Sequence, residues 1–284
     1  MNRVINASHP NGHFYSPVTD PAELAMQAHR LWPSQPEVLG IDFNDEMHEH
    51  VLTELFPKYF GAYDYPEELE ETPDLTDFYT KNSQFSWLDA RSLFVLLRHW
   101  RPKRMIEVGS GFSSLLVADV NRRFLDGSLE FTCVEPYPRA FLNDGLDGIS
   151  RLIQAKVQDV PMSVFEELEA GDILFIDSSH VAKTGSDVNH LYFEVIPRLR
   201  PGVRIHIHDI FLPTEYPHDW VITENRSWNE QYLVRAFLMY NKDFRVLYGS
   251  AYAHHRHANL VANALQLPGR RSFGGGSLWL ERVS

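Results

Sequence analysis

Two acidic residues and two histidines stand at the ends of two predicted strands. One apolar run ends at Asp177, with His180 three residues later, and a later run ends in His208 and Asp209. If these strands are neighbours in a parallel sheet, the four side chains meet at the same edge. Carboxylates and imidazoles in such a group can hold a divalent metal ion, and a hydroxyl group bound to that ion loses its proton more readily. The alternative is that Asp177 and Asp209 only cap the helices that follow them, but the coincidence of four candidate groups favours the metal site.

Two further residues of predicted strands could also carry chemistry. His206 precedes His208 by two residues and therefore lies on the same face of its strand. It either supports a metal ligand from behind or is a hydrogen-bonded core histidine, which we favour slightly. Cys133, the single cysteine, lies inside an apolar run. We expect a small buried hydrophobic residue there rather than a nucleophile, and one cysteine excludes an intrachain disulfide.

A glycine-containing turn follows another apolar run and precedes a predicted helix. Residues 107–114 read EVGSGFSS, and helical periodicity continues over 115–124. Gly109 and Gly111 have no Cβ, so backbone amides can approach a ligand closely, as in nucleotide-binding turns. Dinucleotide enzymes have glycine or alanine where Ser114 stands. Glu107 would repel a pyrophosphate but could bind the ammonium group of an amino-acid-bearing cofactor such as S-adenosylmethionine. The alternative is a turn that merely joins a strand to a helix.

Acidic residues also follow the next two predicted strands. The run 129–134 ends at Glu135, where a doubly wound fold binds ribose hydroxyls. The run 149–157 is followed by Gln158 and Asp159, which suit the amino group of an adenine. Three acids at three successive strand ends therefore favour a nucleoside-type cofactor over a simple connecting turn.

These residues resemble those of the class I S-adenosylmethionine-dependent methyltransferases, over roughly residues 86–284. The resemblance implies that Glu107, Gly109 and Gly111 line the methionine part of the cofactor, that Glu135 binds ribose and that Asp159 binds adenine. We expect Ser110, between the two glycines, and Ser113 to belong to the cofactor-binding residues as well. Ser113 stands at a position that is often glycine in the family, which we expect to be tolerated.

The strand ends at 177 and 208–209 resemble those of metal-dependent O-methyltransferases of the catechol type and especially the macrolide-sugar type. The resemblance implies that Asp177, His208 and Asp209 bind the metal and that His180 is the catalytic base. His208 departs from the pattern, because those relatives have a carboxylate there. Imidazole is a softer ligand than magnesium prefers, so the bound ion could be manganese, iron or zinc instead of magnesium.

The order of apolar runs predicts an α/β fold. Strands near 105, 129, 150, 172 and 203 alternate with helices, which is typical of a doubly wound parallel sheet. The runs 244–252 and 276–282 lack a long helix between them. We therefore expect a seven-stranded, mostly parallel sheet with an antiparallel C-terminal strand, which is also the fold that the resemblance implies.

The charge distribution predicts two regions. Residues 1–85 hold fifteen Asp and Glu against four Lys and Arg, so they carry nearly all of the net charge of −12. This part shows helical patterns at 20–31, where Asp20 precedes Pro21, and at 45–59. We predict an acidic helical appendage or cap over 1–85 and a cofactor-binding methyltransferase domain over 86–284.

The composition excludes some classes of binding partner and indicates a cellular location. The acidic balance argues against a nucleic acid, and the chain has neither an 18-residue apolar run nor a signal-like N-terminus. We expect a cytoplasmic enzyme without a membrane partner, with homo-oligomerisation left open. We expect it to methylate a hydroxyl of a sugar or another small natural product, with S-adenosylmethionine as the methyl donor. The alternatives are a non-haem metal hydroxylase, whose two histidines and one carboxylate could form a metal site, and a cofactor-binding subunit without chemistry.

Overall fold

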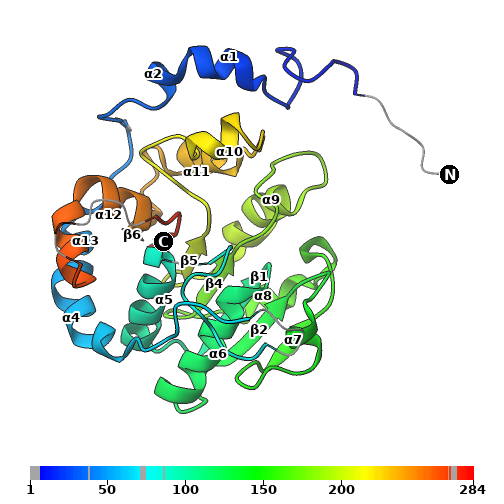
Figure 1. Ribbon diagram of the computed structural model, residues 1–284. Coiled ribbons are helices and arrows are strands. Elements are labelled where there is room, and N and C mark those ends of the chain that lie inside the picture. The colour runs from blue at the N-terminus through cyan, green and yellow to red at the C-terminus, as the bar shows by residue number, and fades with distance from the viewer. Residues whose placement is uncertain (1–6, 38, 71–74, 86, 268, 270–273) are drawn as a thin grey trace.

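The computed structural model describes residues 7–37, 39–70, 75–85, 87–267, 269 and 274–284. Its centre is a seven-stranded sheet of order β3-β2-β1-β4-β5-β7-β6 (Figure 1). The strands are β1 (Arg104–Val108), β2 (Glu130–Val134), β3 (Arg151–Ile153), β4 (Ile173–Ile176), β5 (Arg204–Ile207), β6 (Phe244–Gly249) and β7 (Leu278–Arg282). The first five pair in parallel, while β7 is antiparallel to both of its neighbours. The predicted fold class is therefore confirmed.

The central strands are mostly apolar, as expected where both faces of a parallel sheet are covered. All four residues of β4 are buried. Alternate residues belong to different core clusters, with Met105 and Phe175 on one face and Ile106 and Leu174 on the other.

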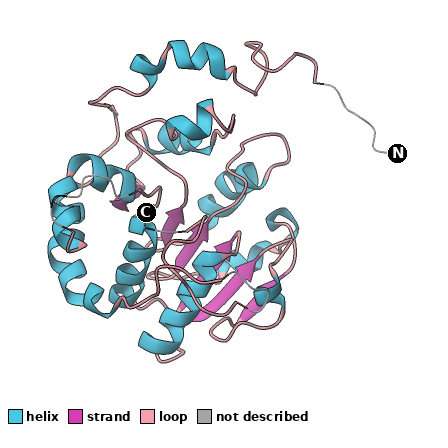
Figure 2. Cartoon of the chain, viewed as in Figure 1, coloured by secondary structure: helices cyan, strands magenta, loops and turns pink. Residues whose placement is uncertain are grey.

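Helices enclose the sheet on both faces (Figure 2). The first face is covered by α5 (Trp87–Trp100), α6 (Phe112–Phe124) and α13 (Ala258–Ala264). The second is covered by α8 (Met162–Glu166), the π-helical turn η4 (Leu191–Val195) and α11 (Glu230–Leu238). The remaining elements after α5 are short: α7 (Ala140–Asn143), η3 (Val157–Asp159), α9 (Asp187–His190), η5 (Ile196–Arg198), α10 (His218–Ile222) and α12 (Ser250–Arg256).

The predicted N-terminal helices form, with interruptions. The Asp20 side chain accepts hydrogen bonds from the amides of Ala22 and Glu23 and so caps α1 (Pro21–Met26). The helical stretch then breaks at Gln27 before α2 (Ala28–Leu31). The second predicted helix is built from α3 (Asp45–His50), η1 (Val51–Leu55) and α4 (Phe56–Tyr59), followed by η2 (Phe60–Ala62).

The acidic N-terminal region is not uniform in its burial. Residues 7–37 contribute no buried residue to the described structure, and Figure 1 shows α1 and α2 lying beyond α10, away from the sheet. By contrast, Val51, Phe56 and Phe78 belong to the core cluster that contains α5 and α6. The domain boundary at 85/86 stays a prediction.

Two predicted strands were too long. The run 149–157 yields only β3, which lies at the edge of the sheet and pairs on one side alone, where short strands are usual. The run 244–252 ends as a strand at Gly249, because Ser250 begins α12 and its alanines and arginine favour a helix. His254 and His255 lie on this helix.

Candidate active site

The glycine turn after β1 is fixed by its contact with the end of β4. Gly109 has a φ of 85°, and a Cβ added there would lie 1.7 Å from the carbonyl oxygen of Asp177. The Asp177 amide donates to the carbonyl of Val108 over 2.9 Å, which locks the two strand ends together. Only glycine allows this approach, so the turn and Asp177 form one rigid unit.

Glu107 lies beneath the turn and is fully buried. One of its carboxylate oxygens accepts a hydrogen bond of 2.6 Å from the Ser113 hydroxyl, and the other accepts one from the Ser114 hydroxyl. Burial raises the Glu107 pKa to about 7, and the serine hydroxyls oppose that shift. The carboxylate holds the first turn of α6 in place and does not line the cavity described below. Its predicted contact with a cofactor ammonium group stays a prediction.

Glu135 follows β2 and lies directly beside the turn. Its carboxylate accepts hydrogen bonds from the amides of Ser110 (3.2 Å) and Tyr137 (2.8 Å) and faces the cavity. Asp159 ends η3 and is exposed, whereas the neighbouring Gln158 lines a cavity wall.

A cavity of about 900 Å³ opens at the carboxyl ends of β1, β4 and β5. It adjoins a second cavity of about 420 Å³, and the two share Gly109, Glu135 and residues 177–179. The larger cavity is also lined by Ser110, Gly111, Ser113, His180, His208 and Asp209. Nearly all of the residues predicted from the sequence therefore face one continuous space, with Glu107 and Asp159 as the exceptions.

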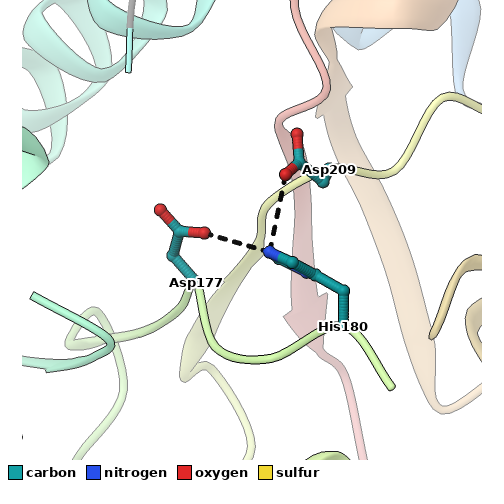
Figure 3. Close-up of side chains that lie close together, drawn as sticks. All are labelled: Asp177, His180 and Asp209. Atoms are coloured by element: carbon teal, nitrogen blue, oxygen red, sulfur yellow. Dashed lines mark ion pairs between the residues drawn. The ribbon is translucent and has the colours of Figure 1, made fainter. Parts of the chain in front are cut away.

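Asp177, His180 and Asp209 converge on one point (Figure 3). The Nε2 atom of His180 lies 3.4 Å from Asp177 Oδ1 and 3.4 Å from Asp209 Oδ2, and one ligand atom from each residue falls within 4.8 Å of the others. His180 and Asp209 both have left-handed backbone conformations, with φ of 58° and 56°. Such strain in non-glycine residues persists only where surrounding contacts enforce it, and it is common at functional sites.

His208 completes the cluster from the opposite side. The ring is buried, and its Nδ1 lies 3.3 Å from Asp177 Oδ1 and 3.6 Å from Asp209 Oδ1. Neither ring nitrogen has a partner with hydrogen-bond geometry. A buried imidazole without such a partner, facing two carboxylates, offers a donor atom to a cation.

The charges of the cluster depend strongly on one another. Burial lowers the pKa of His180, but Asp177 and Glu230 outweigh it and raise the value to about 10. The pKa of His208 is likewise well above its usual range, because Asp177 and Asp209 outweigh burial. Burial raises the pKa of Asp177, but the two imidazoles bring it well below its usual range. At neutral pH both histidines therefore carry protons that a bound cation would have to displace.

Two acids in contact with the histidines were missed by the sequence reasoning. Glu230, fully buried at the start of α11, accepts from His180 Nδ1 over 2.9 Å. Asp89 on α5 lies 3.4 Å from His208 Nε2 and accepts from the amides of Gly276 (2.8 Å) and Ser277 (2.9 Å). Both lie on helices, not at strand ends. A single acid among the apolar residues of α5 was the available signal for Asp89.

His206 is a neutral core histidine. Its ring stacks on Phe175 with centroids 3.7 Å apart, and its Nε2 bonds to the Ser277 hydroxyl over 2.8 Å. Burial brings its pKa well below the usual range. It belongs to the core behind His208 and not to the cavity wall.

The segment between β5 and α11 covers the cavity, and we define residues 211–228 as the lid. Trp220 and Trp228 line the cavity, and the Trp228 ring centroid lies 4.5 Å from that of His180. The Arg226 guanidinium packs over both indole rings and pairs with Glu224 over 2.6 Å. Residues of the lid thus form part of the cavity wall.

The strand order, with its reversed β7, and the glycine turn beside an acidic strand end define a class I methyltransferase. The comparisons agree, because the model of a methyltransferase-domain family matches residues 106–210. These residues include the turn, Glu135 and the whole cluster from Asp177 to Asp209. The chain belongs to this S-adenosylmethionine-dependent methyltransferase family. An uncharacterized protein of Archaeoglobus fulgidus is 38% identical over 174 residues, which cover 60% of this chain and 77% of that protein.

Solved structures with a related fold are distant. An O-methyltransferase from Bacillus cereus in complex with SAH is 13% identical, with a TM-score of 0.41, over 92% of this chain and 97% of that one. The mitomycin 7-O-methyltransferase MmcR is 15% identical, with a TM-score of 0.40, over 68% of this chain and 56% of that one. At these values the likeness adds nothing to what the strand order shows. Within the described residues, no helix has the length and apolar character needed to cross a bilayer.

Proposed function

We propose that this methyltransferase transfers a methyl group from S-adenosylmethionine to a hydroxyl oxygen of a small acceptor, a sugar or another natural product, with the help of a divalent cation. The observation that carries the proposal is the convergence of Asp177, His180 and Asp209 on the wall of a cavity that also contains the cofactor turn; His208 lies 3.3 and 3.6 Å from the two carboxylates. In such an enzyme, alignment of the acceptor and removal of its proton supply most of the rate enhancement.

The cofactor side of the cavity supports this assignment. Glu135 presents a half-buried carboxylate at the end of β2, where ribose hydroxyls would donate to it. The backbone of Gly109, Ser110 and Gly111 is open to the same space. The smaller cavity, with Gln158 in its wall, leaves room for an adenine.

The acceptor side fits a divalent cation. Asp177, Asp209 and His208 would hold the ion, since His208 Nδ1, which has no partner with hydrogen-bond geometry, lies 3.3 and 3.6 Å from their carboxylate oxygens. An imidazole in the set favours manganese, iron or zinc over magnesium. Such an ion lowers the pKa of a bound hydroxyl group.

His180 would accept the acceptor's proton. Its Nε2 faces the cavity cluster while its Nδ1 is held by Glu230. In the metal-free protein its pKa of about 10 keeps the ring protonated at neutral pH. A cation beside Asp177 would oppose that shift, because it neutralises one of the carboxylates that cause it.

Chelation tests the proposal. Exhaustive chelator treatment is expected to abolish methyl transfer to a panel of sugar and phenol hydroxyl acceptors, while calorimetry still detects S-adenosylmethionine binding. Asp209→Asn should mimic chelation, whereas Glu135→Ala should weaken cofactor binding by about 1 to 3 kcal/mol and leave metal content unchanged. Full activity of a protein in which elemental analysis finds no metal would refute the role of the cation.

A metal-dependent hydroxylase is the second candidate, because the cluster also offers two imidazoles and a carboxylate to one ion. Turnover that consumes oxygen, requires ferrous iron and proceeds without S-adenosylmethionine would select it. Methyl transfer under anaerobic conditions would exclude it.

A further inference from the structure

Three consecutive residues at the start of α11 connect the lid to His180. We define Asn229, Glu230 and Gln231 as the α11 entry. Glu230 and Gln231 are buried to within 1% of full burial, although both are polar. Buried polar side chains are hydrogen-bonded, and the hydrogen bonds of the α11 entry run in two directions.

In one direction the α11 entry grips the backbone of residues 180–182. The amides of Asn229 and Glu230 both donate to the carbonyl of His180 over 3.1 Å. The Asn229 side chain accepts from the Ala182 amide over 2.6 Å and donates to the Ala182 carbonyl over 3.2 Å. These bonds enforce the left-handed conformation of His180, whose φ is 58°.

The Glu230 side chain also determines which way the His180 ring faces. An ionised carboxylate only accepts hydrogen bonds, so the 2.9 Å contact places a proton on His180 Nδ1. The other nitrogen, Nε2, is then the atom that faces Asp177 and Asp209, at 3.4 Å from each. In free neutral imidazole either nitrogen can carry the proton. Of these two positions for the proton, the protein therefore favours Nδ1.

In the other direction Gln231 holds the first part of the lid. Its side-chain oxygen accepts from the Phe211 amide over 2.6 Å, and its side-chain nitrogen donates to the Thr214 carbonyl over 3.0 Å. Its own amide donates to the Tyr216 hydroxyl over 2.9 Å. Hence the lid cannot leave its place over the cavity without disturbing the helix start that holds His180.

We propose that Glu230 is a positioning residue for methyl transfer, which fixes the orientation of the His180 ring and the location of its proton, and that the α11 entry couples this setting to the closed lid. The inference rests on the proposed function, in which His180 Nε2 is the proton acceptor. It assigns Glu230 no contact with the acceptor or the cofactor, and Glu230 is absent from the cavity wall.

Kinetics of three variants test the role. Glu230→Leu removes the acceptor for Nδ1, and we expect kcat to fall by about 10- to 100-fold, the usual loss for a carboxylate that orients a histidine. Glu230→Gln keeps a neutral acceptor and should restore part of the rate. The control is Glu194→Gln, which replaces an exposed carboxylate that pairs with Arg198 over 2.9 Å and lies outside the cavity wall; it should retain kcat. Acceptor KM and cofactor affinity should stay within about twofold in all three.

A direct readout separates this inference from the proposed function. In protein labelled with ¹⁵N-histidine, the hydrogen-bonded Nδ1 proton of His180 should give a downfield resonance that disappears in His180→Asn. It should persist in Glu194→Gln, shift in Glu230→Gln and vanish in Glu230→Leu. This holds even if no acceptor is methylated, which would refute the proposed function alone. A wild-type kcat in folded Glu230→Leu, a raised acceptor KM with kcat intact, or an unchanged resonance would overturn the positioning role.

Discussion

Replacement of Gly109 by alanine is the strictest test of how the site is built. The new Cβ would lie 1.7 Å from the Asp177 carbonyl oxygen, whereas Cβ atoms are essentially never found within 3.0 Å of such an atom. The ends of β1 and β4 would therefore have to separate by at least 1.3 Å, the difference between these two values. That shift would break the bond from the Asp177 amide to the Val108 carbonyl and move Asp177 relative to the cofactor turn.

The magnitude follows from two contributions. A left-handed conformation costs a non-glycine residue about 1 to 2 kcal/mol, and the forced separation of packed strands costs about 1 to 3 kcal/mol more. We expect the free energy of unfolding in urea to fall by about 2 to 5 kcal/mol in total. Methyl transfer should fall by about 10²-fold, the effect of a displacement on the scale of 1 Å.

Gly127→Ala is the matched control, because Gly127 also has a positive φ, of 67°, but no atom within 4 Å of the added Cβ. It should lose only the backbone contribution of about 1 to 2 kcal/mol. Urea titrations monitored by circular dichroism measure both variants. Equal losses of stability, with Gly109→Ala still active, would show that the strand ends separate freely and that the close approach is unimportant.

Three further predictions concern the buried charges. Burial raises the Glu107 pKa from 4.5 to about 7, so its ionised carboxylate destabilises the fold above pH 7, and this effect is lost as the pH falls to 4.5. Glu107→Gln should therefore gain stability relative to wild type at pH 8 but not at pH 5. The difference measured by urea unfolding should reach about 3 kcal/mol. The Asp89 pKa is lowered from 3.8 to about 2, so its carboxylate stabilises the fold above pH 3.8, and this effect is lost as the pH falls through 2. Asp89→Asn should therefore lower the free energy of unfolding in urea by about 2 kcal/mol at pH 7 and by little at pH 2. Because the His180 pKa is about 10, manganese binding should tighten as the pH rises from 6 towards 10, and its calorimetric enthalpy at pH 7 should change with the ionisation enthalpy of the buffer; a binding constant independent of pH would contradict the assignment.

The sequence predicted the sheet well because its signal is local and repeated. Each parallel strand is a short apolar run followed by turn residues. Such a run can be recognised in the sequence without knowing which helices pack on it. The errors occurred where tertiary pairing decides the outcome. Residues 149–157 have one neighbouring strand only, and Ser250 begins a helix inside an apolar run. Neither the missing second strand neighbour nor the start of this helix can be predicted from the local sequence pattern.

The candidate site was predictable to the extent that it lies at strand ends. Asp177, His208 and Asp209 follow strands directly, so the topology alone brings them together. Glu230 and Asp89 reach the same place from helices whose position relative to the sheet depends on packing and lid length. No rule of sequence spacing relates these acids to the histidines. Only the structure reveals that Glu230 contacts His180 and that Asp89 contacts His208.

The placement of β7 has a consequence for how the protein matures. This last strand inserts between β5 and β6, and the residues just before it supply the two amides that bind Asp89 and the carbonyl that binds the Ile210 amide over 2.8 Å. During synthesis the N-terminal parts of a chain emerge and fold first. The nascent chain can thus assemble the cofactor turn early, but its histidine cluster stays incomplete until residues 276–282 have left the ribosome. Ribosome-bound chains that have not yet released these residues would accordingly lack the two amides that hold Asp89 beside His208.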